Sequence, residues 1–265
     1  AAGRQITADM YNYPASSTGL GILMPEWVQE GGFEKWVARL KDPAVRKVVG
    51  PEIIKTIMRK QGTPEKVLLI GFHTDSLKYL QGKTLAEIAA MRGKSAEETV
   101  MDLVIDDNSN VSAVFFSMSE DNLRTQIAQP WMMFGSDGKS MAPEGVFLKS
   151  ATHPRAYGNF ARLLGKYVRD EQVITMEEAV RRLTSLPAAN MKLDRRGTLM
   201  QGYYADIVVF DPANIQDHST FENPHQLSTG MSHVFVNGVQ VLRDGEHTGA
   251  TPGRVVRGPG YKGNK

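Results

Sequence analysis

The feature that most constrains this chain is an apolar run that stops abruptly in a turn. Trp131 to Phe134 are all apolar, and Gly135-Ser136-Asp137-Gly138 follow at once. A run without alternation predicts a strand buried on both faces, as in parallel sheets. Because ligands bind at the carboxyl ends of such strands, Asp137 is a candidate general base. Taken alone, these residues favour an ordinary turn, since Ser, Asp and Gly are also what turns select.

The composition excludes several classes of function. The 265 residues carry 31 Lys and Arg against 29 Asp and Glu, and no basic stripe alternates with aromatic residues, which argues against nucleic-acid binding. No apolar stretch is long enough to span a membrane. The chain has no Cys, which excludes disulfides, thiolate metal ligands and a Cys nucleophile. The compartment stays open, with the cytoplasm favoured.

A second strand is expected near the amino end. Residues 5–11 alternate weakly and lead into a polar, turn-forming stretch at 12–19. If this strand lies beside the one that ends at Asp137, Tyr11 and Ser17 reach the same rim. Their hydroxyls could then hydrogen-bond a substrate carbonyl or oxyanion. A half-buried Tyr and a loop Ser are the simpler interpretation of the residues alone.

The intervening and following segments alternate between helices and strands. Residues 20–62 predict helices, with Asp42 as an N-cap before Pro43 and a break at Gly50-Pro51. Three capping boxes, at Thr84, Ser95 and Thr175, give their glutamates a structural role. The remaining expected elements are strands at 66–71 and 111–117 and helices at 119–129, 157–169 and 176–185.

The predicted secondary structure changes from helices to short strands at Gly197. Short strands are expected at 205–211, 233–238 and 239–245, and Asn237-Gly238 between the last two is a strong hairpin signal. We therefore divide the chain into an α/β body at 1–196 and a small β domain at 197–265, which ends in a tail.

Five segments together resemble the N-acyl-D-amino-acid deacylases (D-aminoacylases) of the amidohydrolase superfamily. The resemblance covers nearly the whole chain and rests on these stretches: 8–13 with Ser16-Ser17-Thr18, Gly135-Ser136-Asp137-Gly138, His153-Pro154-Arg155 with Gly158, 202–211, and Val236-Asn237-Gly238. The last two mark the superfamily broadly. The Ser-Asp-Gly and His-Pro-Arg pairing is narrower and points to the D-acyl branch.

This resemblance implies an α/β fold: the C-terminal part of a metal-dependent (β/α)8 barrel with a helical insertion at about 20–125, followed by a small β-sandwich. It also implies that Asp137 is the general base, and could be a weak metal ligand, and that Arg155 pairs with the substrate's α-carboxylate. Tyr11, Ser17 and Ser136 would line the substrate pocket, and His153 would either contact the substrate or order its loop. The implied cofactor is one or two Zn ions.

The family's main metal ligands are not found in this sequence. The family pattern has a His-x-His pair, whereas the six histidines here show no such spacing. The ligands would lie upstream of Ala1, in a missing N-terminal half of the barrel that is then a necessary partner. The favoured function is hydrolysis of N-acyl-D-amino acids to a carboxylic acid and a D-amino acid. The alternatives are a catalytically silent subunit that needs a partner, and a cyclic amidase such as a dihydroorotase.

Overall fold

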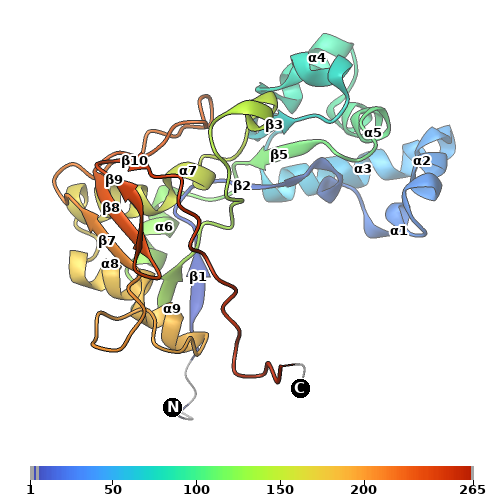
Figure 1. The fold of residues 1–265 in the computed structure, drawn as a ribbon. Helices are drawn as coiled ribbons and strands as arrows, with labels where there is room; N and C mark the ends of the chain where they lie inside the picture. Colours follow the sequence, from blue (N-terminus) through green and yellow to red (C-terminus); the bar gives the residue numbers. More distant parts are fainter. Residues whose placement is uncertain (1–2, 4–5, 264–265) are drawn as a thin grey trace.

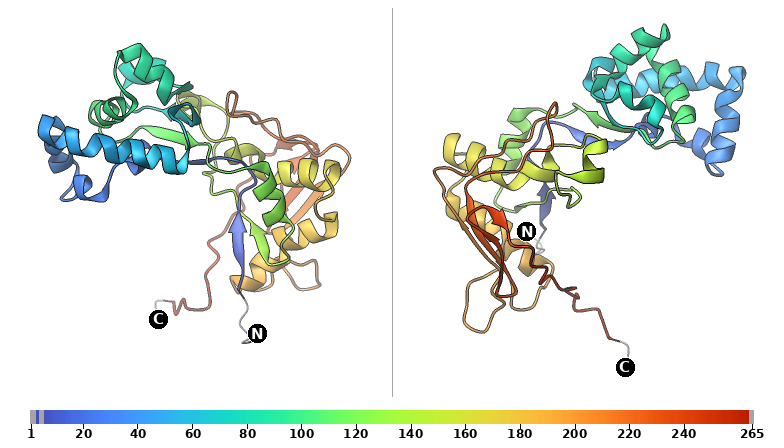
Figure 2. Two further views of the ribbon diagram at one scale, coloured as in Figure 1. Left: turned by 180° about the vertical axis from the view of Figure 1, so that it is seen from behind. Right: turned by 45° about the horizontal axis from the view of Figure 1, so that its top comes forward.

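The computed structural model describes residue 3 and residues 6–263, which form two lobes (Figure 1). One lobe holds the parallel strand pair, the helices that follow it and the C-terminal sheet. The other is the long insertion between the two parallel strands, and Figure 2 shows it extending to one side of the first lobe.

The strand expected near the amino end lies beside the one that leads to Asp137, a pairing that the sequence analysis stated only as a condition. Strand β1 (Ala8–Met10) pairs in parallel with β6 (Met132–Phe134), with Met10 opposite Phe134. All three residues of β6 are buried, as the apolar run predicts, while Trp131 lies outside the strand and is exposed. Gln5, where the first strand was expected to begin, lies outside the described residues. The pairing brings the segments after both strands to one edge.

The insertion is a mixed α/β lobe rather than a purely helical one. An antiparallel sheet in the order β2-β5-β3-β4 packs with helices around one apolar core. The strands are β2 (Ser16–Gly19), β3 (Val67–Gly71), β4 (Lys83–Thr84) and β5 (Ser112–Phe115). The helical elements are η1 (Leu20–Leu23), α1 (Glu26–Gln29), α2 (Phe33–Lys41), α3 (Pro43–Lys60), η2 (Pro64–Lys66), η3 (Asp75–Leu80), α4 (Leu85–Arg92) and α5 (Ala96–Asp106).

The predicted break at Gly50-Pro51 is wrong, because α3 runs through it without interruption. A proline inside a helix removes one backbone hydrogen bond and costs about 3 kcal/mol. Val49, Ile53 and Ile57 are fully buried on one face of this helix, and each contributes roughly 1.5–3 kcal/mol. Burial of that face therefore outweighs the lost bond.

Helix starts follow the sequence signals in most respects. Asp42 caps α3 by accepting from the Ala44 amide, and Thr84 with Glu87 forms the complete capping box of α4. Ser95 and Thr175 cap their helices through the hydroxyl alone. At the latter, the Glu178 carboxylate pairs with Arg181 and Arg182 instead.

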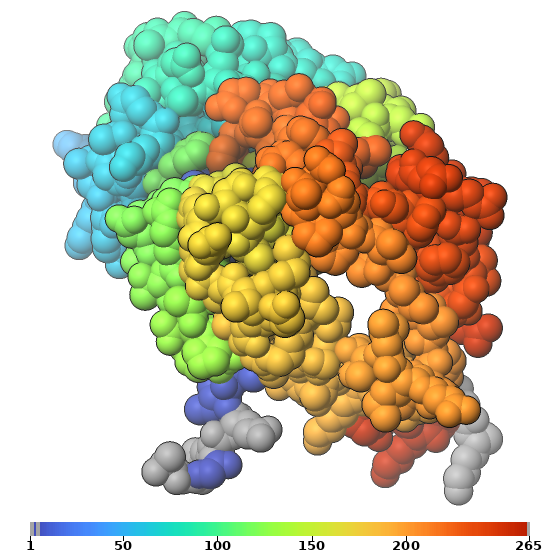
Figure 3. Space-filling view, turned by 90° about the vertical axis from the view of Figure 1, so that its left-hand side faces the viewer, coloured from blue at the N-terminus to red at the C-terminus, as the bar shows by residue number. Residues whose placement is uncertain are grey.

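Helices pack around the parallel pair after the insertion. They are α6 (Glu120–Ile127), η4 (Gly145–Lys149), α7 (Arg155–Arg162), its π-helical continuation η5 (Leu163–Asp170), α8 (Met176–Leu183) and α9 (Ser185–Asn190). The helix expected at 157–169 therefore begins two residues earlier, and the one expected at 176–185 ends at Leu183, after which α9 begins. In the space-filling view the yellow helical region lies between the green α6 segment and the orange 211–230 segment (Figure 3).

The C-terminal region forms one antiparallel sheet in the order β10-β9-β8-β7. Its strands are β7 (Ile207–Phe210), β8 (Met231–Val236), β9 (Val239–Arg243) and β10 (Glu246–His247). The predicted hairpin is confirmed, since Val236 pairs with Val239 and the intervening Asn237 and Gly238 have φ of 50° and 80°.

The complete barrel and the β-sandwich stay predictions. The described residues supply one parallel pair and, at the C-terminal end, one sheet layer, and the domain boundary at 196/197 also stays a prediction. No helix among them is both long and apolar enough to cross a membrane.

Candidate active site

Four of the predicted site residues line one cavity. It has a volume of about 460 Å³ and lies between the insertion sheet and the 137–156 segment. Ser17, Asp137, His153 and Arg155 contribute to its wall, together with Ile70, Met141, Phe147 and Ser150. The cavity thus brings together residues from β2 and from the segment after β6, which lie more than a hundred positions apart in the chain.

Asp137 and Arg155 form an ion pair in the cavity wall. Arg155 Nη2 lies 2.8 Å from Asp137 Oδ2. Asp137 has a φ of 46°, a left-handed conformation that Asp adopts more readily than most residues, and its side chain is 72% exposed. Arg155 is buried, and its Nη1 has no hydrogen-bond partner in the described part of the chain. The pair therefore joins an accessible carboxylate to a guanidinium with unused donors.

Tyr11 supports the guanidinium. The Arg155 Cζ lies 4.5 Å from the centre of the Tyr11 ring, a cation–π arrangement. Burial raises the pKa of the Tyr11 hydroxyl, although the Arg155 charge acts in the opposite direction, so the hydroxyl stays protonated at neutral pH. Tyr11 thus contacts Arg155 but is not among the described residues that line the cavity, and its place at the substrate rim stays a prediction.

Ser136 shapes the turn that carries Asp137. Its Oγ accepts a hydrogen bond of 3.2 Å from the Gly138 amide. A Cβ on Gly138 would lie 3.2 Å from the Ala156 Cα, so the turn and the start of α7 approach closely at a glycine. Substrate contacts by Ser136 and Ser17 stay predictions.

His153 orders the loop that precedes α7. Its Nε2 donates to the Ala15 carbonyl at 2.9 Å, and its Nδ1 accepts from the Arg155 amide at 3.0 Å. Burial lowers its pKa from 6.5 to about 4, and the neighbouring Arg155 charge acts in the same direction. At neutral pH the ring is therefore neutral, with both nitrogens engaged.

The buried His153 ring predicts a loss of stability in acid. Its folded-state pKa of about 4 lies below its ordinary value of 6.5, so between these values the unfolded chain binds more protons and stability falls as pH falls. We expect His153 to account for a loss of about 3 kcal/mol between pH 7.5 and 4. Urea unfolding of wild type and His153→Gln at both pH values measures this difference.

The control for that experiment is His73→Gln, because His73 is exposed. This control should lose as much stability in acid as wild type does. An equally large acid loss in His153→Gln would contradict the assignment.

Two asparagines that were not predicted as site residues, Asn12 and Asn159, connect the elements that support the site. The Asn159 side chain accepts from the Asn12 amide at 3.1 Å and donates to the Gly135 carbonyl at 3.1 Å. Both asparagines are almost fully buried. One feature of the sequence could have indicated a role for Asn159 in the site, since it lies four residues after Arg155 and therefore on the same helix face.

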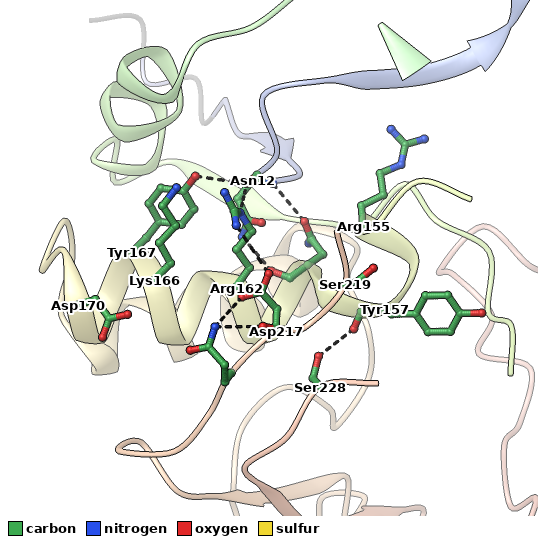
Figure 4. Close-up of polar contacts among 12 residues, drawn as sticks. Asn12, Arg155, Tyr157, Arg162, Lys166, Tyr167, Asp170, Asp217, Ser219 and Ser228 are labelled. Atoms are coloured by element: carbon green, nitrogen blue, oxygen red, sulfur yellow. Dashed lines mark hydrogen bonds and ion pairs between the residues drawn. The ribbon is translucent and has the colours of Figure 1, made fainter. Parts of the chain in front are cut away.

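A charged network lies behind the strand ends. Arg162 Nε donates to the Asn12 carbonyl at 3.1 Å, and the Tyr167 hydroxyl donates to Glu120 Oε2 at 2.8 Å. Arg162 also pairs with Glu120 at 3.0 Å. Figure 4 shows Arg162 and Tyr167 converging on Asn12, with Arg155 extending away from this cluster. The network holds the exit of β1 and leaves Arg155 to the cavity.

The described residues do not make a complete metal site. Within residues 6–263 no three His, Asp or Glu side chains converge in a way that could hold a metal ion. Asp137 is a single carboxylate already paired with Arg155. A zinc site here would require ligands from outside the described residues.

The sequence matches a family model and several curated relatives. The model described as "Amidohydrolase family" matches residues 24–242. A D-aminoacylase of Alcaligenes xylosoxydans xylosoxydans is 40% identical over 177 residues, which are 67% of this chain and 34% of that protein. An N-acyl-D-glutamate deacylase of the same organism is 33% identical over 257 residues, or 97% of this chain and 42% of the relative. The chain therefore spans well under half the length of these relatives.

Solved structures give the same result. A crystal structure of D-aminoacylase superposes with a TM-score of 0.70 at 33% identity, covering 96% of this chain and 43% of that one. An N-acyl-D-glutamate deacylase from Bordetella bronchiseptica, complexed with zinc and a phosphonate inhibitor, superposes with a TM-score of 0.66 at 31% identity, covering 90% and 40%.

Proposed function

The chain belongs to the amidohydrolase family, and from that premise we propose that it forms part of an enzyme that hydrolyses the amide bond of N-acyl-D-amino acids. The products would be a carboxylic acid and a free D-amino acid. The curated relatives, which include an N-acyl-D-aspartate deacylase at 38% identity, are named for this class of reaction. The observation that carries the proposal is the buried Arg155 beside the accessible Asp137 in one cavity.

Arg155 would hold the α-carboxylate of the substrate. A planar guanidinium binds a carboxylate through two parallel hydrogen bonds. The buried Arg155 Nη1 has no hydrogen-bond partner among the described residues and would be available to donate. The Tyr11 ring packs against the guanidinium, and the Arg155 backbone amide donates a hydrogen bond to His153 Nδ1 at the start of the helix. This anchor would set the position of the neighbouring amide, and with the pocket shape it would select the D-enantiomer.

Asp137 would transfer the proton. As water adds to the amide carbonyl carbon, its proton passes to the Asp137 carboxylate. The same proton then passes to the leaving nitrogen as the C–N bond breaks. Asp137 pairs with Arg155 at 2.8 Å, so a substrate carboxylate bound to Arg155 would compete with Asp137 for the guanidinium and would bring the neighbouring amide close to the Asp137 carboxylate. Ser17, in the same cavity wall, is the proposed hydrogen-bond donor to the carbonyl or the acyl group.

We propose that one or two zinc ions support this reaction, held mainly by residues outside this chain. One related D-aminoacylase structure is described by its binuclear metal centre, and another relative contains zinc. Zinc would polarise the amide carbonyl and the attacking water. The remainder of the barrel is the corresponding proposed partner.

The test uses the intact gene product that contains this chain. We expect hydrolysis of N-acetyl-D-glutamate, N-acetyl-D-aspartate or a neutral N-acetyl-D-amino acid, with the L-enantiomer about a hundredfold or more slower. Chelation should abolish the activity and zinc should restore it. Amine release measured with both enantiomers decides the question. Equal rates for the two enantiomers would contradict the proposed D-selectivity, and no hydrolysis of any of these substrates would favour the catalytically silent subunit.

A further inference from the structure

We infer that Asn159 is a positioning residue that sets the distance between Asp137 and Arg155. The inference rests on the proposed function for its consequence in catalysis, and on the geometry for its structural part. Asn159 is 2% exposed and lies on α7, one turn after Arg155. It is not among the described residues that line the cavity, so it would act through others rather than on the substrate.

One side chain joins the ends of both parallel strands. Asn159 Oδ1 accepts from the Asn12 amide, and Asn159 Nδ2 donates to the Gly135 carbonyl. Asn12 follows Tyr11, and Gly135 lies two residues before Asp137. The Gly135 amide in turn donates to the Met10 carbonyl at 3.0 Å, which continues the strand pairing. The Asn159 side-chain amide therefore contacts the two segments that carry Tyr11 and Asp137.

The helix that carries Asn159 also carries Arg155. The Asn12 side chain donates to the Asn159 carbonyl at 2.8 Å, which ties β1 to the helix backbone as well. A Cβ on Gly158 would lie 2.4 Å from the Tyr13 hydroxyl, so the helix and the β1 exit approach as closely as a glycine allows. Three elements that supply Tyr11, Asp137 and Arg155 thus meet at Asn159.

The two bonds of Asn159 can be separated by substitution. Asn159→Asp keeps an oxygen that accepts from the Asn12 amide. When ionised, the new carboxylate cannot donate to the Gly135 carbonyl, so a carboxylate oxygen and the carbonyl oxygen would face each other with no proton between them. This change should release the Asp137 segment and leave the β1 end in place. Asn159→Leu removes both bonds, and Asn190→Asp, an exposed helical asparagine, is the matched control.

Kinetics of the intact gene product at pH 8 test the catalytic part. We expect Asn159→Asp to lower kcat for N-acetyl-D-amino acids about ten- to a hundredfold, because small displacements of a reacting group are costly. KM should stay within about threefold, because Arg155 keeps its place at the start of the helix. Asn190→Asp should leave both constants unchanged. A kcat within twofold of wild type in Asn159→Asp would overturn the inference.

Amide hydrogen exchange tests the structural part without any activity. Peptides covering 133–138 should exchange at least tenfold faster in Asn159→Asp, while those covering 8–11 stay as in wild type; Asn159→Leu should accelerate both.

If wild type hydrolyses no N-acyl-D-amino acid, the proposed function fails and this measurement alone decides the positioning role. Unchanged exchange at 133–138 would overturn it. If Asn159→Asp does not fold, Asn159→Ser takes its place; it adds no charge but is too short to make either bond, so exchange should rise at both 133–138 and 8–11.

Discussion

Asp137→Asn is expected to lower kcat for N-acyl-D-amino acid hydrolysis by about two to four orders of magnitude, the usual contribution of general acid–base catalysis. Asn has almost the same shape as Asp and also tolerates the left-handed backbone, with φ of 46°, that residue 137 adopts. The substitution therefore removes the proton acceptor without straining the turn. Steady-state kinetics with a saturating N-acetyl-D-amino acid in the intact gene product measure the effect.

The same variant should not raise KM. Asp137 competes with the substrate carboxylate for Arg155, since the two side chains pair at 2.8 Å, so a neutral amide at 137 leaves the guanidinium freer to bind the substrate. The matched control is Asp121→Asn, which removes an exposed aspartate paired with Arg124 at 3.0 Å on α6. Its kcat should be unchanged. A kcat in Asp137→Asn within tenfold of wild type would remove the assigned role.

Local sequence signals predicted several elements of the fold, one of which leads to the site. The run ending at Phe134 and the Asn237-Gly238 pair both specify their structures through neighbouring residues, and both predictions are confirmed. The parallel pairing of β1 with β6 was predicted only as a condition, because strand partners depend on distant parts of the chain. The prediction at Gly50-Pro51 was wrong, because burial of Val49, Ile53 and Ile57 outweighs a local rule.

The contacts within the site could not be predicted in the same way. Sequence motifs identified Asp137 and Arg155, but nothing in them shows that the two side chains pair across the turn. The positive φ of Asp137 and the neutral state of His153 are consequences of packing. Asn159 and Asn12 lie 147 positions apart, and the spacing of Asn159 from Arg155 indicates a shared helix face without showing which backbone groups the side chain binds. Long-range polar contacts of this kind need the folded chain.

Arg155→Gln is expected to lower kcat/KM for N-acyl-D-amino acids about a hundred- to a thousandfold. Loss of a buried charge that pairs with a ligand carboxylate costs roughly 3–4 kcal/mol, which corresponds to that range. Most of the loss should fall on KM, because the interaction is present in the bound substrate as well as in the transition state. Arg155→Lys should recover only part of it, since an ammonium cannot bind a carboxylate through two parallel bonds or stack in the same way on Tyr11.

A substrate without the carboxylate separates recognition by Arg155 from any general damage. Wild type should prefer an N-acetyl-D-amino acid over its C-terminal amide by about the factor that Arg155→Gln loses, whereas the variant should treat the two substrates nearly alike. Arg92→Gln, which breaks the Arg92–Asp106 pair of 3.0 Å in the insertion, should keep the wild-type preference. If Arg155→Gln also kept that preference, another cation would have to hold the carboxylate. Within the cavity wall the remaining Lys or Arg side chain is Lys139, which would then be the residue to replace.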